Sequence, residues 1–239
     1  MGRVLRDLVQ IPQGVRAPSV RQARRLLDGS YRSVDDILVA AQELETIRRT
    51  GNGSTRGRRA QREVDLLRAA LVFSSAGIDA SMTRLVNDAG RALIRVSETG
   101  AHAQYREFLK QAIPAKSVDS GLRDVLLDME IEETVLNYYL SQKTKASFQG
   151  SGDLKTRVVT VLGLPASTLN QSVVKELDEF FIARNEVVHQ MDFTERSGRS
   201  IARQSRDLNE VMKQCNSALG VAAELVNATV STLAKARVR

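Results

Sequence analysis

Apolar residues recur every three or four positions along nearly the whole chain, and this spacing places them on one face of an α-helix. We find no short alternating segments joined by hairpin-turn residues and no internal repeat. Only 4% of the 239 residues are aromatic and none is Trp, so the core must rest on Leu, Val, Ile and Ala. These side chains suit helix-on-helix packing. The sequence therefore predicts an all-α helical bundle with a long C-terminal helix.

The periodic segments predict helices at 19–27, 34–49, 59–96, 103–112, 118–145, 154–163, 170–192 and 201–236. Ser33, with Asp36 three residues later, is placed to open the second helix with a capping box. Ser117 is placed to cap the fifth helix, and Gly77 is a point at which the long third helix could bend. The last helix approaches a heptad repeat, which is typical of either a core helix or a dimerising one.

The charge of the chain is strongly positive. A net charge of +7 and an isoelectric point of about 9.8 favour an anionic partner such as RNA. One basic, Gly-rich stretch ends a predicted helical N-terminal extension, residues 1–58, and leads into the main helical domain at 59–239. Its candidate RNA-binding residues are Arg56, Arg58, Arg59 and Arg62. The same stretch also fits a solvated connector that its arginines keep soluble.

Several classes of site are not expected in this chain. The one Cys excludes an intramolecular disulfide and a thiolate metal cage, and we expect Cys215 to pack as a small apolar residue. The N-terminal apolar stretch is too short and too charged for a signal peptide, and no apolar run approaches the roughly 20 residues of a membrane span. We therefore expect a soluble cytoplasmic protein. An acidic run at 128–133 points in scattered directions around a helix, so we expect it to be solvated rather than metal-binding.

An unusual set of polar residues lies on the predicted helix at 170–192. Its apolar stripe consists of Leu177, Phe180, Phe181, Val188 and Met191. Arg184 falls in the middle of this stripe, and a buried Arg needs a partner of opposite charge. Asn185, His189 and Asp192 lie along the flank of the same stripe. Arg can hold two phosphate oxygens, Asn can donate a hydrogen bond, and His can transfer a proton near neutral pH, so the set suits a phosphodiester.

A purely structural interpretation is also open. Arg184 could form a buried ion pair, and Glu133, which lies within the apolar stripe of its own predicted helix, is the expected partner. His189 would then be a capping or surface residue. A single Arg and a single His on one helix occur often by chance, so spacing alone does not decide between the two interpretations.

The segment RNEVVH, residues 184–189, resembles the motif of the HEPN superfamily, in which Arg-Asn is followed by three residues and His. LVFSSAGIDASMTRLV is similar to the first core helix of the RiboL-PSP branch, which carries an acidic residue at the position of Asp79. VLGLPASTLNQSVVKELDEFF is similar to the approach to the motif helix. The resemblance covers roughly residues 60–230.

This resemblance implies a metal-independent endoribonuclease without a cofactor. The ribose 2′-hydroxyl would attack the adjacent phosphate, leaving a 2′,3′-cyclic phosphate and a 5′-hydroxyl. Arg184 would stabilise the phosphorane, Asn185 would orient the phosphate or the imidazole, and His189 would transfer protons. Asp79 or Asp192 would fix the imidazole tautomer. Family members commonly pair their motif helices across a two-fold axis, so a homodimer with a composite site is expected.

The same resemblance implies a toxin or anti-phage defence effector that an inhibitory or regulatory protein partner holds in check. The alternative is a catalytically inactive HEPN-fold scaffold or partner-binding subunit. A buried pair between Arg184 and Glu133 would favour that alternative, because Arg184 would then need no phosphate.

Overall fold

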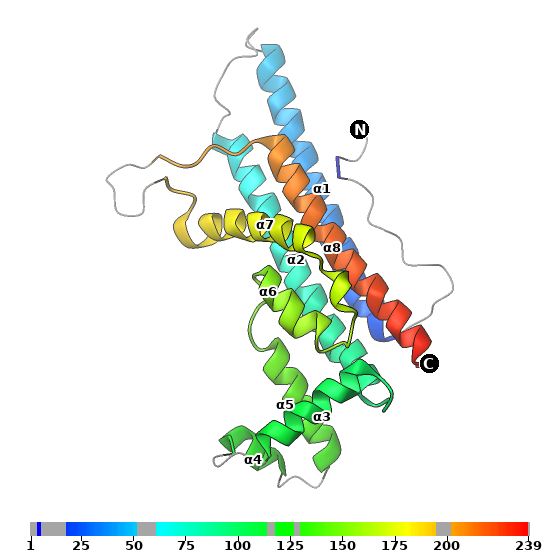
Figure 1. Ribbon diagram of the computed structural model, residues 1–239. Helices are drawn as coiled ribbons and strands as arrows, with labels where there is room; N and C mark the ends of the chain where they lie inside the picture. The colour runs from blue at the N-terminus through cyan, green and yellow to red at the C-terminus, as the bar shows by residue number, and fades with distance from the viewer. Residues whose placement is uncertain are drawn as a thin grey trace.

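The computed structural model describes residues 4–5, 18–51, 61–113, 118–126, 130–194 and 202–238 of the chain, and within them the protein is all-α (Figure 1). The helices are α1 (Pro18–Gly51), α2 (Gln61–Ile94), α3 (Gly100–Ala112), α4 (Ser120–Leu126), α5 (Ile131–Thr144), α6 (Ser151–Asp153), α7 (Gln171–Gln190) and α8 (Leu208–Lys235). A π-helical turn, η1 (Leu154–Val159), continues α6, and a 3-10 turn, η2 (Ala166–Thr168), precedes α7. The predicted all-α fold with a long C-terminal helix is confirmed.

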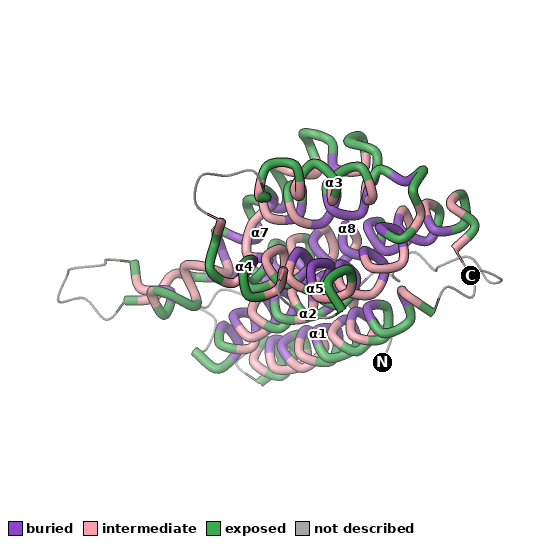
Figure 2. Tube along the Cα trace, turned by 90° about the horizontal axis from the view of Figure 1, so that it is seen from below, coloured by how far each residue is buried: buried purple, intermediate pink, exposed green. Residues whose placement is uncertain are grey.

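Three long helices form the body of the protein. α1 and α2 run antiparallel as a hairpin, and α8 lies along both of them (Figure 1). Their buried faces point toward one another (Figure 2), and Leu38, Leu71, Leu85 and Leu225 are completely buried there. α7 crosses α2 and α8, while α3, α4 and α5 gather at the C-terminal end of α2. The helices predicted at 59–96, 103–112 and 170–192 are therefore confirmed.

The first helix is continuous, so the predicted break before Val34 and the capping role of Ser33 are wrong. α1 runs through Ser33 because its flanking residues Tyr31 and Val34 are buried against the rest of the core. The carboxylate of Asp35 instead accepts hydrogen bonds from the backbone N–H groups of Val4 and Leu5, at 2.9 and 2.8 Å. Packing of α1 on α2 thus outweighs the local helix-start signal at Ser33.

Gly77 lies where α2 meets α1. A Cβ atom at this position would lie 1.9 Å from the Ser30 hydroxyl oxygen and 2.1 Å from the Ser30 Cβ. That hydroxyl donates to the Phe73 carbonyl at 3.1 Å. α2 continues through Gly77 as one helix. Glycine is therefore required here for close helix contact.

The predicted single helix at 118–145 is wrong, because two helices replace it. α4 and α5 pack on each other, and Leu122 of α4 and Leu136 of α5 are both buried. Asp119 accepts from the Gly121 backbone N–H at 3.0 Å and from the Tyr138 hydroxyl at 2.7 Å, which joins the two helices. In one straight helix Leu122 and Leu136 would lie about 21 Å apart along the axis, so the two segments could not pack on each other. The predicted cap Ser117 lies outside the described residues.

α8 begins seven residues later than predicted. The Asp207 carboxylate accepts from the backbone N–H groups of Asn209 and Glu210, at 2.9 and 3.2 Å, and so caps the helix. Buried residues recur along the whole length of α8, from Leu208 to Leu233, so α8 is a core helix. Cys215 is fully buried, as predicted, and burial raises the pKa of its thiol to about 12. The thiol is therefore unreactive in the folded protein.

α8 is also apolar enough, by length and composition, to cross a membrane, so the expectation that no segment reaches this limit was wrong. Within its most apolar window, 56% of the residues are buried inside the bundle. This pattern fits the core helix of a helical protein equally well.

Candidate functional site

The candidate site lies on the second half of α7. Asn170 caps the helix by accepting from the Val173 backbone N–H at 3.1 Å. Leu177, Phe180 and Phe181 are buried, and they anchor the first half of the helix in the core. The predicted continuation of this apolar stripe is wrong, because Val188 and Met191 are 39% and 57% exposed. Ile182 is exposed as well, so three large apolar side chains of this segment, here called the apolar surface of α7, are exposed.

Arg184 is half-buried and has no carboxylate partner within the described residues. Its Nη1 donates to the Asn185 side-chain oxygen at 2.9 Å. Its Nε is buried without any hydrogen-bond partner in the described part of the chain. Leaving a buried donor of a permanent cation without a partner is energetically unfavourable, and a bound anion would relieve this cost.

The expected partner of Arg184 is engaged elsewhere. Glu133, on α5, forms ion pairs with Arg91 and Arg95 of α2. The predicted Arg184–Glu133 pair is therefore wrong. Glu133 pairs with these two arginines because α5 packs on the C-terminal part of α2 rather than on α7.

His189 lies one turn beyond Asn185, and its side chain is exposed. Within the described ranges the imidazole forms no hydrogen bond and no ion pair. Such a ring is accessible to a substrate, and it equally fits the surface residue of the structural interpretation. Neither Asp79 nor Asp192 contacts it through a hydrogen bond.

Asp79 is placed away from the motif by its own hydrogen bond. Its carboxylate accepts from the Phe148 backbone N–H at 2.7 Å and thereby fastens the segment before α6 to α2. Arg68, which contacts the end of α7, lies eleven positions earlier in α2, which is about 16 Å along the helix axis. The structure does not bring Asp79 together with Arg184, Asn185 and His189 by any contact among the described residues.

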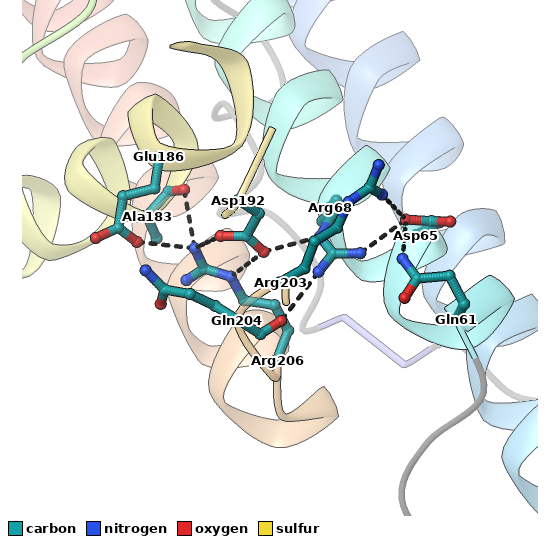
Figure 3. A network of polar contacts seen from close by, with 9 residues as sticks. All are labelled: Gln61, Asp65, Arg68, Ala183, Glu186, Asp192, Arg203, Gln204 and Arg206. Atoms are coloured by element: carbon teal, nitrogen blue, oxygen red, sulfur yellow. Dashed lines mark hydrogen bonds and ion pairs between the residues drawn. The ribbon is translucent and has the colours of Figure 1, made fainter. Parts of the chain in front are cut away.

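Asp192 has a role that the sequence did not indicate, because it is fully buried and lies between two arginines (Figure 3). It accepts from Arg68 Nε at 2.8 Å and from Arg206 Nη2 at 2.5 Å. Burial alone would raise the pKa of Asp192, but the hydrogen bonds and charges of Arg206 and Arg68 outweigh it and lower that pKa below its ordinary value. Asp192 forms no hydrogen bond with the His189 imidazole among the described residues, because both of its oxygens accept from arginines.

The same network fixes the turn that carries the motif. Arg206 Nη2 also donates to the Glu186 carboxylate at 2.9 Å and to the Ala183 carbonyl at 3.4 Å, on either side of Arg184 and Asn185 (Figure 3). The chain leaves α7 through a left-handed Met191, whose φ is 49°. Gln204 then donates its backbone N–H to the Asp192 carbonyl at 2.8 Å. The network therefore holds the motif helix to α2 and to the start of α8.

One signal could have indicated this network. Arg68 interrupts the apolar stripe of α2 between Leu67 and Leu71, just as Arg184 interrupts that of α7. The partner Asp192 lies 124 positions away, which no local pattern reveals.

The basic stretch is only partly described. Arg56, Arg58 and Arg59 lie outside the described residues, and Arg62 is exposed in the first turn of α2. Two neighbouring cations are already paired: Arg48 contacts Glu63 at 3.1 Å, and Arg49 contacts Glu45 at 2.7 Å. Carboxylates therefore partly neutralise the charge next to the basic stretch.

No protein-family model, no curated protein and no solved structure matches this chain.

Proposed function

We propose that this protein is a metal-independent endoribonuclease of HEPN type, with Arg184, Asn185 and His189 as its phosphate-handling and proton-transfer residues. The buried, unpartnered Nε of Arg184 is the observation that carries the proposal. The guanidinium is half-buried, its one protein hydrogen bond goes to a neutral amide, and no described carboxylate pairs with it. An RNA phosphate would satisfy the remaining donors with charge-assisted hydrogen bonds.

The proposed reaction is transesterification within RNA. The 2′-oxygen forms a bond to phosphorus while the bond from phosphorus to the 5′-oxygen breaks. The proton of the 2′-hydroxyl passes to a base, and an acid protonates the departing 5′-oxygen. His189 is the group of suitable chemistry on this helix, and Arg184 stabilises the negative charge on the phosphorane.

One α7 supplies one imidazole, whereas the reaction is best served by a base and an acid. A homodimer that pairs its α7 helices across a two-fold axis would supply both. The apolar surface of α7 supports this arrangement. Among the described residues, Ile182, Val188 and Met191 are large apolar side chains that remain exposed within ten positions of one helix. Large apolar side chains that remain exposed within one short segment are typical of protein contacts.

The test is cleavage of a single-stranded RNA in EDTA by the wild type, His189→Ala, Arg184→Ala and Lys175→Ala. Lys175 is exposed on the same helix, so its variant removes one positive charge without touching the motif. We expect cleavage by the wild type and Lys175→Ala, and a loss of at least about 100-fold in the other two variants. A substrate with 2′-deoxyribose at the cleaved position should resist cleavage, because it lacks the nucleophile.

A scaffold function is the outcome that would replace this proposal. A scaffold function is favoured if the folded wild type cleaves RNA no faster than both motif variants. The apolar surface of α7 would then serve as the binding surface for a protein partner.

A further inference from the structure

A second concave site lies at the far end of the bundle, apart from α7. A cavity of about 600 Å³ opens between the end of α2, the start of α3 and the start of α5. Ile94, Ile131 and Leu136 form its apolar wall. The polar groups of the lining come from Arg95, His102, Tyr105, Glu130, Glu132 and Glu133. This volume falls within the range of small-molecule sites.

His102 presents an acceptor in this cavity. Its Nδ1 lies 2.7 Å from the Ile94 carbonyl oxygen. A carbonyl can only accept, so Nδ1 must carry the proton of that hydrogen bond. In the neutral ring, Nε2 is then an acceptor with an unshared electron pair. Tyr105, which also lines the cavity, adds a phenol hydroxyl group to the lining.

The lining carries more negative than positive charge, with Glu130, Glu132 and Glu133 against Arg95, although the protein as a whole carries a net charge of +7. Arg91 and Arg95 neutralise Glu133, but Glu132 has no ion-pair partner within the described residues. Burial, followed by the charges of Glu132 and Glu133, raises the pKa of the Tyr105 phenol.

We propose that this cavity binds a small organic amine, with an ammonium group held by Glu132, the Tyr105 hydroxyl and His102 Nε2, and an alkyl stem on Ile94 and Leu136. A divalent metal fits less well, since the described residues contain no group of three or more His, Cys, Asp or Glu side chains that converge on one point. An alkylammonium tolerates a wider spacing, because its donors and apolar stem are spread along the molecule. The proposal does not depend on ribonuclease activity.

The test uses the full chain with spermidine as the probe, in the absence of RNA and at about 150 mM salt to suppress weak surface attraction. Isothermal titration should give saturable binding with one site per chain. We expect Glu132→Gln to weaken this binding at least tenfold. Glu107→Gln is the matched control, because Glu107 is an exposed residue of α3 outside the cavity lining, and its variant changes the net charge equally. 1,5-Pentanediol, which has a similar stem without charge, should not bind.

Histidine NMR locates the site, because the chain has only two His residues. Spermidine should shift the ring signal of His102 and leave that of His189 unchanged. The proposal is overturned if binding is not saturable, if Glu132→Gln and Glu107→Gln weaken it equally, or if the shift occurs at His189 instead.

Discussion

The proposed function depends on Arg184. The effect of this residue on the free energy of unfolding distinguishes a functional role from a structural one. Removing a buried donor that has no partner should not destabilise the fold. We predict that Arg184→Met leaves the free energy of unfolding unchanged or raises it by about 1 kcal/mol. Urea unfolding followed by circular dichroism measures this.

Arg206 is the matched control, because it is a buried arginine with carboxylate partners. Arg206→Met should lower the free energy of unfolding by about 3 kcal/mol, since it leaves Asp192 with a single cation. If Arg184→Met is as destabilising as Arg206→Met, then Arg184 is a structural residue.

Asp192 should make the stability depend on pH in the acidic range. Its pKa is lowered in the folded state, so its stabilising contribution is complete above the unfolded pKa of about 3.9 and is lost as the pH falls through the lower folded pKa. Asp192→Asn keeps the shape and tolerates the left-handed φ of 62°. We predict that this variant loses about 3 kcal/mol at pH 7.

The difference between the wild type and Asp192→Asn should shrink as the pH falls from 4 toward 2. Urea unfolding at a series of pH values tests this. A difference that stays constant over that range would show that the carboxylate charge contributes nothing.

At the scale of elements, the sequence predicted most helices but not their junctions. α7 was predictable because Asn170 caps it and Leu177, Phe180 and Phe181 repeat at helical spacing. The continuous α1 was not predictable because it depends on packing against α2 and α8. The division of 118–145 into α4 and α5 was not predictable because it depends on the packing of these two helices on each other. The arginine network was missed for the same reason. The motif on α7 could be located from sequence, whereas the position of Asp79 away from it could not.

Glycine substitutions test the packing of α1 on α2. We predict that Gly77→Ala lowers the free energy of unfolding by about 1–3 kcal/mol, because its methyl group would collide with Ser30. Gly220→Ala is the control: nothing lies within 4 Å of its added Cβ in the middle of α8. That variant should gain about 0.5–1 kcal/mol from helix propensity.

Thermal unfolding of the two variants measures the contrast. Equal stability of both would show that α1 and α2 do not approach each other as closely as described. Adding Ser30→Gly to Gly77→Ala should restore part of the loss, because it removes the side chain that the methyl group meets.

At the scale of the whole molecule, the proposed active form is a dimer. We predict that Ile182→Asp raises the dimer dissociation constant at least tenfold, which is about 1.4 kcal/mol. Ile182 is 59% exposed, so the change should leave the monomer folded. Ile47→Asp is the control, because Ile47 is 62% exposed on α1, outside the α7 surface. Sedimentation equilibrium measures both, and equal dissociation constants for the two variants would argue against pairing through α7.

The chemistry of the RNA ends is the most direct test of the central claim. Purified wild type should cleave RNA in EDTA and leave 2′,3′-cyclic phosphate and 5′-hydroxyl ends, while a His189→Ala preparation made in parallel leaves the RNA intact. Ends that carry a 5′-phosphate and a 3′-hydroxyl, or equal cleavage by both preparations, would contradict the proposal that His189 and Arg184 promote attack by the 2′-hydroxyl.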